Sequence, residues 1–286
     1  MAAARAWTAP TLAACGGNSV NSSRELAEQL PTAGAHIRRP AAPVRCHDGR
    51  VDPRVEQLAA LANSDHASVL ARYFQVRPGG YGQGDVFIGI RLGDLRTVAK
   101  PYTKLEYRGA DWLPLLRSPV HEHRQLALLV MAARAQRGKN DESAAIYRDY
   151  LSNTEHVNNW DLVDASCGPI VGGFLQNRDR APLYELAASA LIWERRIAVV
   201  GSQHFLKAGE TDDLFALAEL LLNDRQDLMH KAVGWSLREA GKRVSRDALR
   251  GFLDRHAARM PRTALRYAIE HFDEAERQHY LRIPRE

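Results

Sequence analysis

The chain has 286 residues, of which 45% are hydrophobic and 26% charged, so it is long and apolar enough to bury a sizeable core. Its formal net charge of +5 suits a polyanionic partner, although charge alone does not establish one. Three scattered cysteines without C-x-x-C spacing argue against a disulfide framework and a zinc knuckle, and no apolar run is long enough for a membrane span. We therefore expect a cytoplasmic protein without a metal or a cofactor.

The first 52 residues differ in composition from the rest of the chain. They are rich in Ala, Pro, Gly, Ser and Arg, and Pro40 and Pro43 interrupt any helix there. We expect a disordered extension with one short helix around residues 24–30, and we assign residues 53–286 to a single folded domain.

From residue 53 onward, apolar residues recur at the three- and four-residue spacing of amphipathic helices. Clear stripes are Leu126-Leu129-Val130-Ala133, Leu183-Leu186-Ala187-Ala190 and Leu214-Leu217-Ala218-Leu221. Residues 85–90 are the one candidate strand, and the glycines of residues 79–84 just before them favour an ordered loop instead. The pattern predicts an all-α domain.

Helices with similar beginnings recur along the chain. Polar residues open apolar helical stretches at positions 125, 161, 196, 231 and 266, at intervals of 35 or 36 residues. A repeat of this length holds two helices and predicts a curved solenoid of HEAT-like repeats, built from paired antiparallel helices. Equivalent positions of such repeats meet on one groove, where we expect Asp161, Arg196, Lys231 and Arg266.

Three segments of consecutive repeats carry an unusual chemistry. Trp160 and Asp164 are four residues apart, and Trp235 and Arg238 three apart, so each pair shares a helix face. Residues 192–196 (IWERR) form the third segment. Each segment alone is more often structural, with Trp160 in the core and Asp164 as a cap or ion-pair partner. Their common register favours a functional site.

These segments give the chain a resemblance to a known family. Residues 71–74 (ARYF), 87–90 (FIGI), 160–164 (WDLVD), 192–196 (IWERR) and 231–239 (KAVGWSLRE) match, in order and spacing, the bacterial DNA alkylation repair glycosylases of the AlkD-like family. The resemblance runs from about residue 69 to 272. Residues 1–52 have no counterpart, and residues 79–84 form a longer loop than usual.

The resemblance implies a monomeric enzyme whose HEAT-like repeats cradle duplex DNA and which removes N3- or N7-alkylated purines without flipping the base. It implies that Asp164 is the catalytic aspartate, that Trp160 and Trp235 flank the deoxyribose of the lesion, and that Arg196 lies beside the aspartate. It further implies that Tyr73 lies near the cleft and that three cations meet phosphates: Arg96, Lys231 and Arg238.

The chemistry implied by this family suits these residue types. An alkylated purine is already cationic, so it leaves without a general acid, and the positive charge passes to the sugar as an oxocarbenium ion. A carboxylate such as Asp164 stabilises that charge and can activate water, and indole faces add cation–π attraction. Arg196 either holds a neighbouring phosphate or lowers the pKa of Asp164.

Other interpretations remain open at this point. The chain is alternatively a non-catalytic HEAT-repeat DNA-binding protein, a relative specialised for bulky adducts, or a peptide-binding solenoid. Residues 121–123 (HEH) lack metal-ligand spacing, so we expect a solvated helix start there. We expect Cys167 to be a small packing residue.

Overall fold

The computed structural model describes residue 44 and residues 51–285, which belong to one compact unit that runs from Pro43 to Glu286. This part of the chain is helical and holds no strand; one isolated parallel bridge joins Val86 to Val120. The extension predicted for residues 1–52 lies almost wholly outside the described residues and stays a prediction. None of the described helices combines the length and hydropathy that a membrane span requires.

The helices run in chain order as α1 Pro53–Ala60, α2 Ser64–Tyr73, α3 Leu92–Tyr102, α4 Gly109–Leu116, α5 His121–Arg137, α6 Asn140–Leu151, α7 Trp160–Cys167, α8 Gly173–Leu175, α9 Ala181–Ala187, α10 Ile192–Gly201, α11 Asp212–Leu220, α12 Asp227–Arg243, α13 Arg246–His256, α14 Arg262–Ala268 and α15 Glu274–Arg282. Short irregular helices connect some of them: η1 Thr154–His156, η2 Gly168–Gly172 and η3 Ser202–Ala208.

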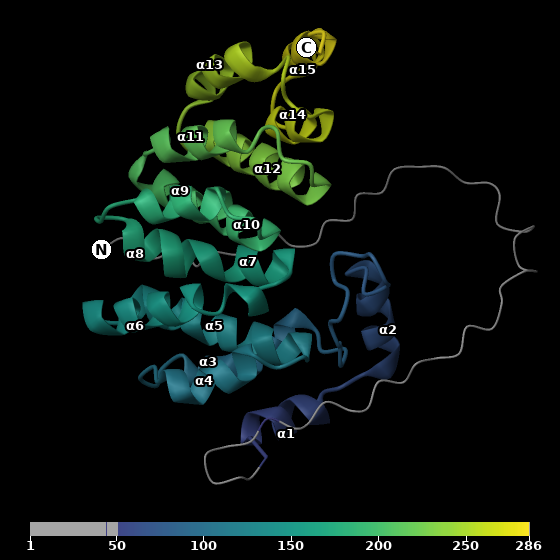
Figure 1. Ribbon diagram of the computed structural model, residues 1–286, viewed down its shortest axis with the longest axis vertical. Helices are drawn as coiled ribbons and strands as arrows, with labels where there is room; N and C mark the ends of the chain where they lie inside the picture. Colours follow the sequence, from purple (N-terminus) through teal and green to yellow (C-terminus); the bar gives the residue numbers. More distant parts are fainter. Residues whose placement is uncertain (1–43, 45–50, 286) are drawn as a thin grey trace, which may run out of the picture. The chain divides into compact units, whose positions relative to one another are not determined.

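Five helices form one layer of the unit. In this layer α5, α7, α10, α12 and α14 follow one another, and each contacts the next. Helices α6, α9, α11 and α13 form a second layer on one side of them (Figure 1). The five positions that recur in the sequence all lie on the first layer, so the predicted helical-repeat solenoid is confirmed.

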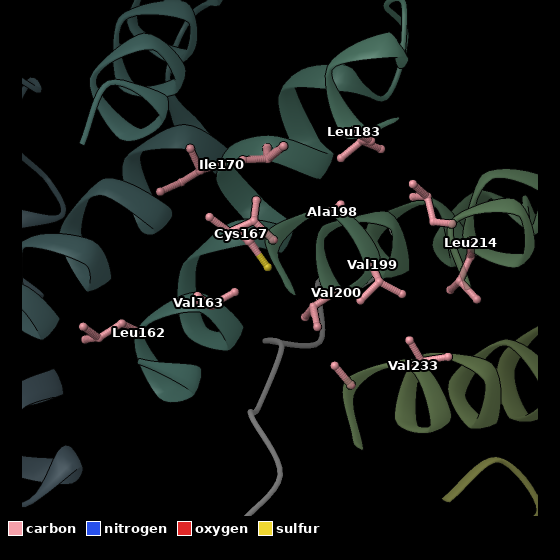
Figure 2. Close-up of a cluster of buried hydrophobic side chains, with 14 of the residues drawn as sticks. Leu162, Val163, Cys167, Ile170, Leu183, Ala198, Val199, Val200, Leu214 and Val233 are labelled. Atoms are coloured by element: carbon pink, nitrogen blue, oxygen red, sulfur yellow. The ribbon is translucent and has the colours of Figure 1, made fainter. Parts of the chain in front are cut away.

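One part of the buried core lies within the first layer, where α7 and α10 meet. Leu162, Val163 and Cys167 of α7 are fully buried, and Val163 and Cys167 point toward residues 198–200 of α10 (Figure 2). The prediction that Cys167 is a packing residue is therefore confirmed. Beyond it, Pro169 has no N–H to continue the α-helical hydrogen bonds, and the chain widens into the π-helical turn η2.

The loop between α2 and α3 covers the start of α5. The carboxylate of Glu122 accepts backbone hydrogen bonds from residues 88–90, at 2.7 Å from the nitrogen of Gly89 and 3.1–3.3 Å from the other two. His121, Glu122 and His123 are all buried. The predicted solvated helix start at residues 121–123 is therefore wrong, because an ordered loop takes the place of water there.

Candidate functional site

A carboxylate and a guanidinium from neighbouring repeats form the centre of the site. Asp164 of α7 accepts two hydrogen bonds from Arg196 of α10, from Nε and from Nη2, each at 2.8 Å. The Nη1 group of Arg196 donates to the carbonyl of Leu228 on α12, also at 2.8 Å. One planar, bidentate cation thus holds the carboxylate and connects three helices of the first layer.

The two partners of this ion pair differ in exposure. The side chain of Arg196 is 7% exposed and that of Asp164 is 19% exposed. Asp164 is an ion-pair partner, as expected if the residue is structural, yet its side chain still reaches solvent. Each carboxylate oxygen accepts more than one hydrogen bond, so both oxygens keep accepting capacity beyond Arg196.

Burial governs the protonation of this carboxylate. Loss of solvation raises the pKa of Asp164, and the charge and hydrogen bonds of Arg196 lower it without cancelling the rise. The nearby charge of Asp161 acts in the same direction as burial. Arg196 therefore opposes the rise in the pKa of Asp164, which is the direction expected from the sequence for one of its two roles.

Aromatic side chains surround the indole of Trp160 at the start of α7. The ring of Phe74 stacks on it with centroids 5.3 Å apart, and Tyr73 meets it edge-on at 6.1 Å. Its Nε1–H donates to the hydroxyl of Tyr81 at 3.3 Å. The structure therefore brings Tyr73 and Trp160 together, and Phe74 covers one face of the indole.

Trp235 lies on the neighbouring part of α12. It is half-buried against the core and follows Leu228 by seven residues, hence on the same face of the helix. Within residues 51–285, no hydrogen bond and no aromatic pair joins Trp235 directly to Trp160 or Asp164. The link is indirect, through the bond from Arg196 to the carbonyl of Leu228.

The cations expected at phosphates have different environments. Lys231 pairs with Asp227 at 2.7 Å and keeps 43% of its side chain exposed. Arg96 is exposed on α3, and none of the ion pairs formed within residues 51–285 includes it. Arg238 is held by Glu239 and Glu270, and its side chain is only 17% exposed. Arg238 is thus the least available of the three for a phosphate.

A buried polar network beside Trp160 was not predicted from the sequence. His121 donates from Nδ1 to Asp85 at 3.0 Å and from Nε2 to Asp161 at 2.9 Å. Arg124 reaches the second oxygen of Asp85 at 2.6 Å. Gln125 donates to Asp161 at 3.0 Å. The network ties the loop and α5 to the first turn of α7, which carries Trp160.

The charges of this network stabilise each other. Burial lowers the pKa of His121, but the charge and hydrogen bond of Asp161 and the bond to Asp85 outweigh it and raise the pKa to about 9. Burial raises the pKa of Asp85, but the hydrogen bond from His121 and the charge of Arg124 outweigh this effect. The pKa of Asp85 is therefore lower than that of an ordinary aspartate. His121 is therefore a buried imidazolium between two carboxylates at neutral pH. In the described part of the chain, no three His, Cys, Asp or Glu side chains converge as metal ligands would.

Comparison with known proteins places the chain in a family. Among solved structures, a predicted DNA alkylation repair enzyme from Enterococcus faecalis is similar, with a TM-score of 0.58 and 17% sequence identity over 74% of this chain and 97% of that one. At this identity the likeness shows a shared fold. No curated protein matches the chain. The profile of the DNA alkylation repair enzyme family matches residues 55–272, which include every residue of the site described above. The chain therefore belongs to the DNA alkylation repair enzyme family.

Proposed function

We propose that this protein is a monofunctional DNA glycosylase that hydrolyses the N-glycosidic bond of N3- or N7-alkylated purines in duplex DNA, without flipping the base, as a step of base excision repair. The observation that carries the proposal is the unequal exposure of the central ion pair. Asp164 reaches solvent while Arg196 is closed off, so the pair presents an anion, and a reaction through a cationic sugar requires an anion at that point.

The chemistry follows from this arrangement. The alkylated base leaves as a neutral purine with the electrons of the glycosidic bond, and the sugar becomes an oxocarbenium ion. Asp164 stabilises that ion and accepts a proton from the attacking water. Arg196 holds the carboxylate in place and keeps it charged, since its Nε and Nη2 groups both donate to Asp164.

The indoles supply a second stabilising interaction. Phe74 covers one face of Trp160, so the other face is the one offered to the sugar. An aromatic face near a cation contributes about 0.5–2 kcal/mol. Trp235 is expected to act from the α12 side of the same site.

The proposal is tested by replacing the carboxylate. We expect Asp164→Asn to slow release of 7-methylguanine from a methylated duplex at least about a hundredfold, because the amide carries no charge. Binding to the same duplex is expected to change little. The measurement is single-turnover release of base, together with DNA affinity and the melting temperature of the variant.

A matched control removes a carboxylate elsewhere. Asp213→Asn breaks the ion pair with Arg180 in the second layer and is expected to keep the wild-type rate. Base release by Asp164→Asn at the wild-type rate would refute the assignment. A wild-type protein that binds the duplex but releases neither methylated nor bulky adducts would instead be a non-catalytic DNA-binding member of the family.

A further inference from the structure

Tyr81 lies at the centre of the glycine-rich loop and contacts the indole of the candidate site. Its hydroxyl accepts from Nε1 of Trp160 at 3.3 Å and donates to the carbonyl of Tyr73 at 3.1 Å. The side chain of Tyr81 is half-buried. One hydroxyl thus connects the end of α2 to the first residue of α7, and the only polar atom of the indole is bound by it.

The loop is held firmly enough to place this hydroxyl. At Gly82 a Cβ atom would lie 2.2 Å from the carbonyl oxygen of Phe74, so the backbone approaches α2 more closely than any other residue type allows. At the end of the loop, Asp85 is fixed by His121 and Arg124. Close packing and a buried anchor therefore restrain the segment on both sides of Tyr81.

The same hydroxyl is also affected by a charge on α12. Burial raises the pKa of Tyr81, and the positive charge of Lys231 on α12 acts against that rise. The phenol of Tyr81 in turn acts on Lys231. The phenol of Tyr81 and the ammonium group of Lys231 are therefore coupled electrostatically.

We propose that Tyr81 is a positioning residue, whose hydroxyl fixes the rotation of the Trp160 indole so that the face away from Phe74 is presented to the substrate sugar. The proposal rests on the proposed function. Trp160 has no other hydrogen-bond acceptor on Nε1 among the described residues. Without Tyr81, stacking on Phe74 still holds the ring plane but leaves the indole free to slide and turn within that plane.

The test uses Tyr81→Phe, which keeps the ring and removes the hydroxyl. We expect the single-turnover rate of 7-methylguanine release to fall about fivefold, the value of one hydrogen bond, with little change in DNA affinity. In the Trp160→Phe background the same substitution is expected to have no further effect, because the bond is already absent. Tyr184→Phe is the control: it removes a tyrosine hydroxyl that donates to Asp213 in the second layer, and it is expected to leave the rate unchanged.

A spectroscopic measurement separates the contact from catalysis. With 5-fluorotryptophan in place of the five tryptophans, the ¹⁹F resonance of position 160 is identified by its loss in Trp160→Phe. Tyr81→Phe is expected to shift that resonance and to leave the resonance of Trp112 in place. An unmoved resonance, an unchanged rate, or additive losses in the double variant would each overturn the role of Tyr81. If the wild-type protein releases no base, the proposed function fails, whereas an active wild type with an equally active Tyr81→Phe defeats this inference alone.

Discussion

At the scale of single residues, the pairing of Asp164 with Arg196 decides what the site can do. Burial alone favours a neutral carboxyl, and a neutral carboxyl would stabilise no cation. Arg196 opposes this effect through two hydrogen bonds and its charge. The rate of base release is therefore expected to depend on pH through Asp164, with loss of activity as the pH falls through a pKa above the ordinary value of an aspartate.

This dependence gives a prediction for Arg196→Gln. Removal of the cation leaves burial and Asp161 to raise the pKa of Asp164 further, so the acid limb of the rate profile should move to higher pH. The adjacent arginine provides the control. Arg195 pairs with Asp224 at 2.6 Å, and Arg195→Gln should leave the acid limb in place. An acid limb that stays at the same pH in Arg196→Gln would contradict the electrostatic role.

The sequence predicted part of this arrangement. The four-residue spacing of Trp160 and Asp164 and the repeat interval to Arg196 indicated which residues share a face, and the structure places Asp164 against Arg196. Tyr81 gave no such signal, because it lies in a loop, where no periodicity relates a residue to its neighbours in space. The bond from Tyr81 to Trp160 spans 79 positions of the chain.

At the scale of elements, the first turn of α5 shows that a polar stretch of sequence can be buried in the fold. Residues 121–125 are polar and charged, which is typical of a solvated helix start, but all five are buried. Their partners Asp85 and Asp161 lie 36 and 40 positions away. Helical periodicity predicts which stretches are helices, whereas it does not predict that a distant loop will supply the counter-charges.

The buried imidazolium gives this element a pH-dependent stability. A histidine whose pKa is raised to about 9 in the folded state stabilises the fold fully below its unfolded pKa, and this contribution is lost as the pH rises through about 9. We expect the free energy of unfolding to fall by on the order of 3 kcal/mol between neutral pH and pH values above 9. Urea denaturation at a series of pH values measures it.

Two variants make this measurement specific. His121→Phe should be less stable at neutral pH and should lose the alkaline decline that His121 causes. His123 lies two residues away, and burial lowers its pKa to about 4, so it stays neutral over the same range. His123→Gln should therefore keep the decline, and an identical decline in His121→Phe would show that another group causes it.

At the scale of the whole molecule, the repeats and the net positive charge were predictable, whereas the availability of individual cations was not. The 35-residue interval identified the first layer of helices, since each repeat must bury its apolar face against the next. The resemblance treats Arg96 and Arg238 alike. In the structure Arg96 is exposed, whereas two glutamates neutralise Arg238.

The difference between these arginines predicts different effects on DNA binding. A cation that meets a phosphate releases a counterion, so Arg96→Ala should reduce the slope of log affinity against log salt by about 0.9. Arg238→Ala should leave that slope unchanged and lower the melting temperature instead. Fluorescence anisotropy with a labelled duplex at several salt concentrations measures both slopes, and a smaller slope in Arg238→Ala alone would reverse the assignment.

The contact between α12 and α14 has a consequence for how this chain can evolve. A Cβ atom on Gly234 would lie 2.3 Å from the carbonyl oxygen of Ala264 and 2.6 Å from the Cβ atom of Tyr267. Residue 234 therefore sets the spacing between the last repeats, and it lies immediately before Trp235. Most apolar positions of a repeat can exchange one hydrophobic side chain for another of similar volume. At position 234 no side chain fits, because the distance between α12 and α14 depends on the absence of a Cβ atom. A substitution of Gly234 by alanine would push α14 away from α12. The rotation and spacing between these repeats would then no longer match the helical pitch of the DNA duplex that the domain is proposed to bind.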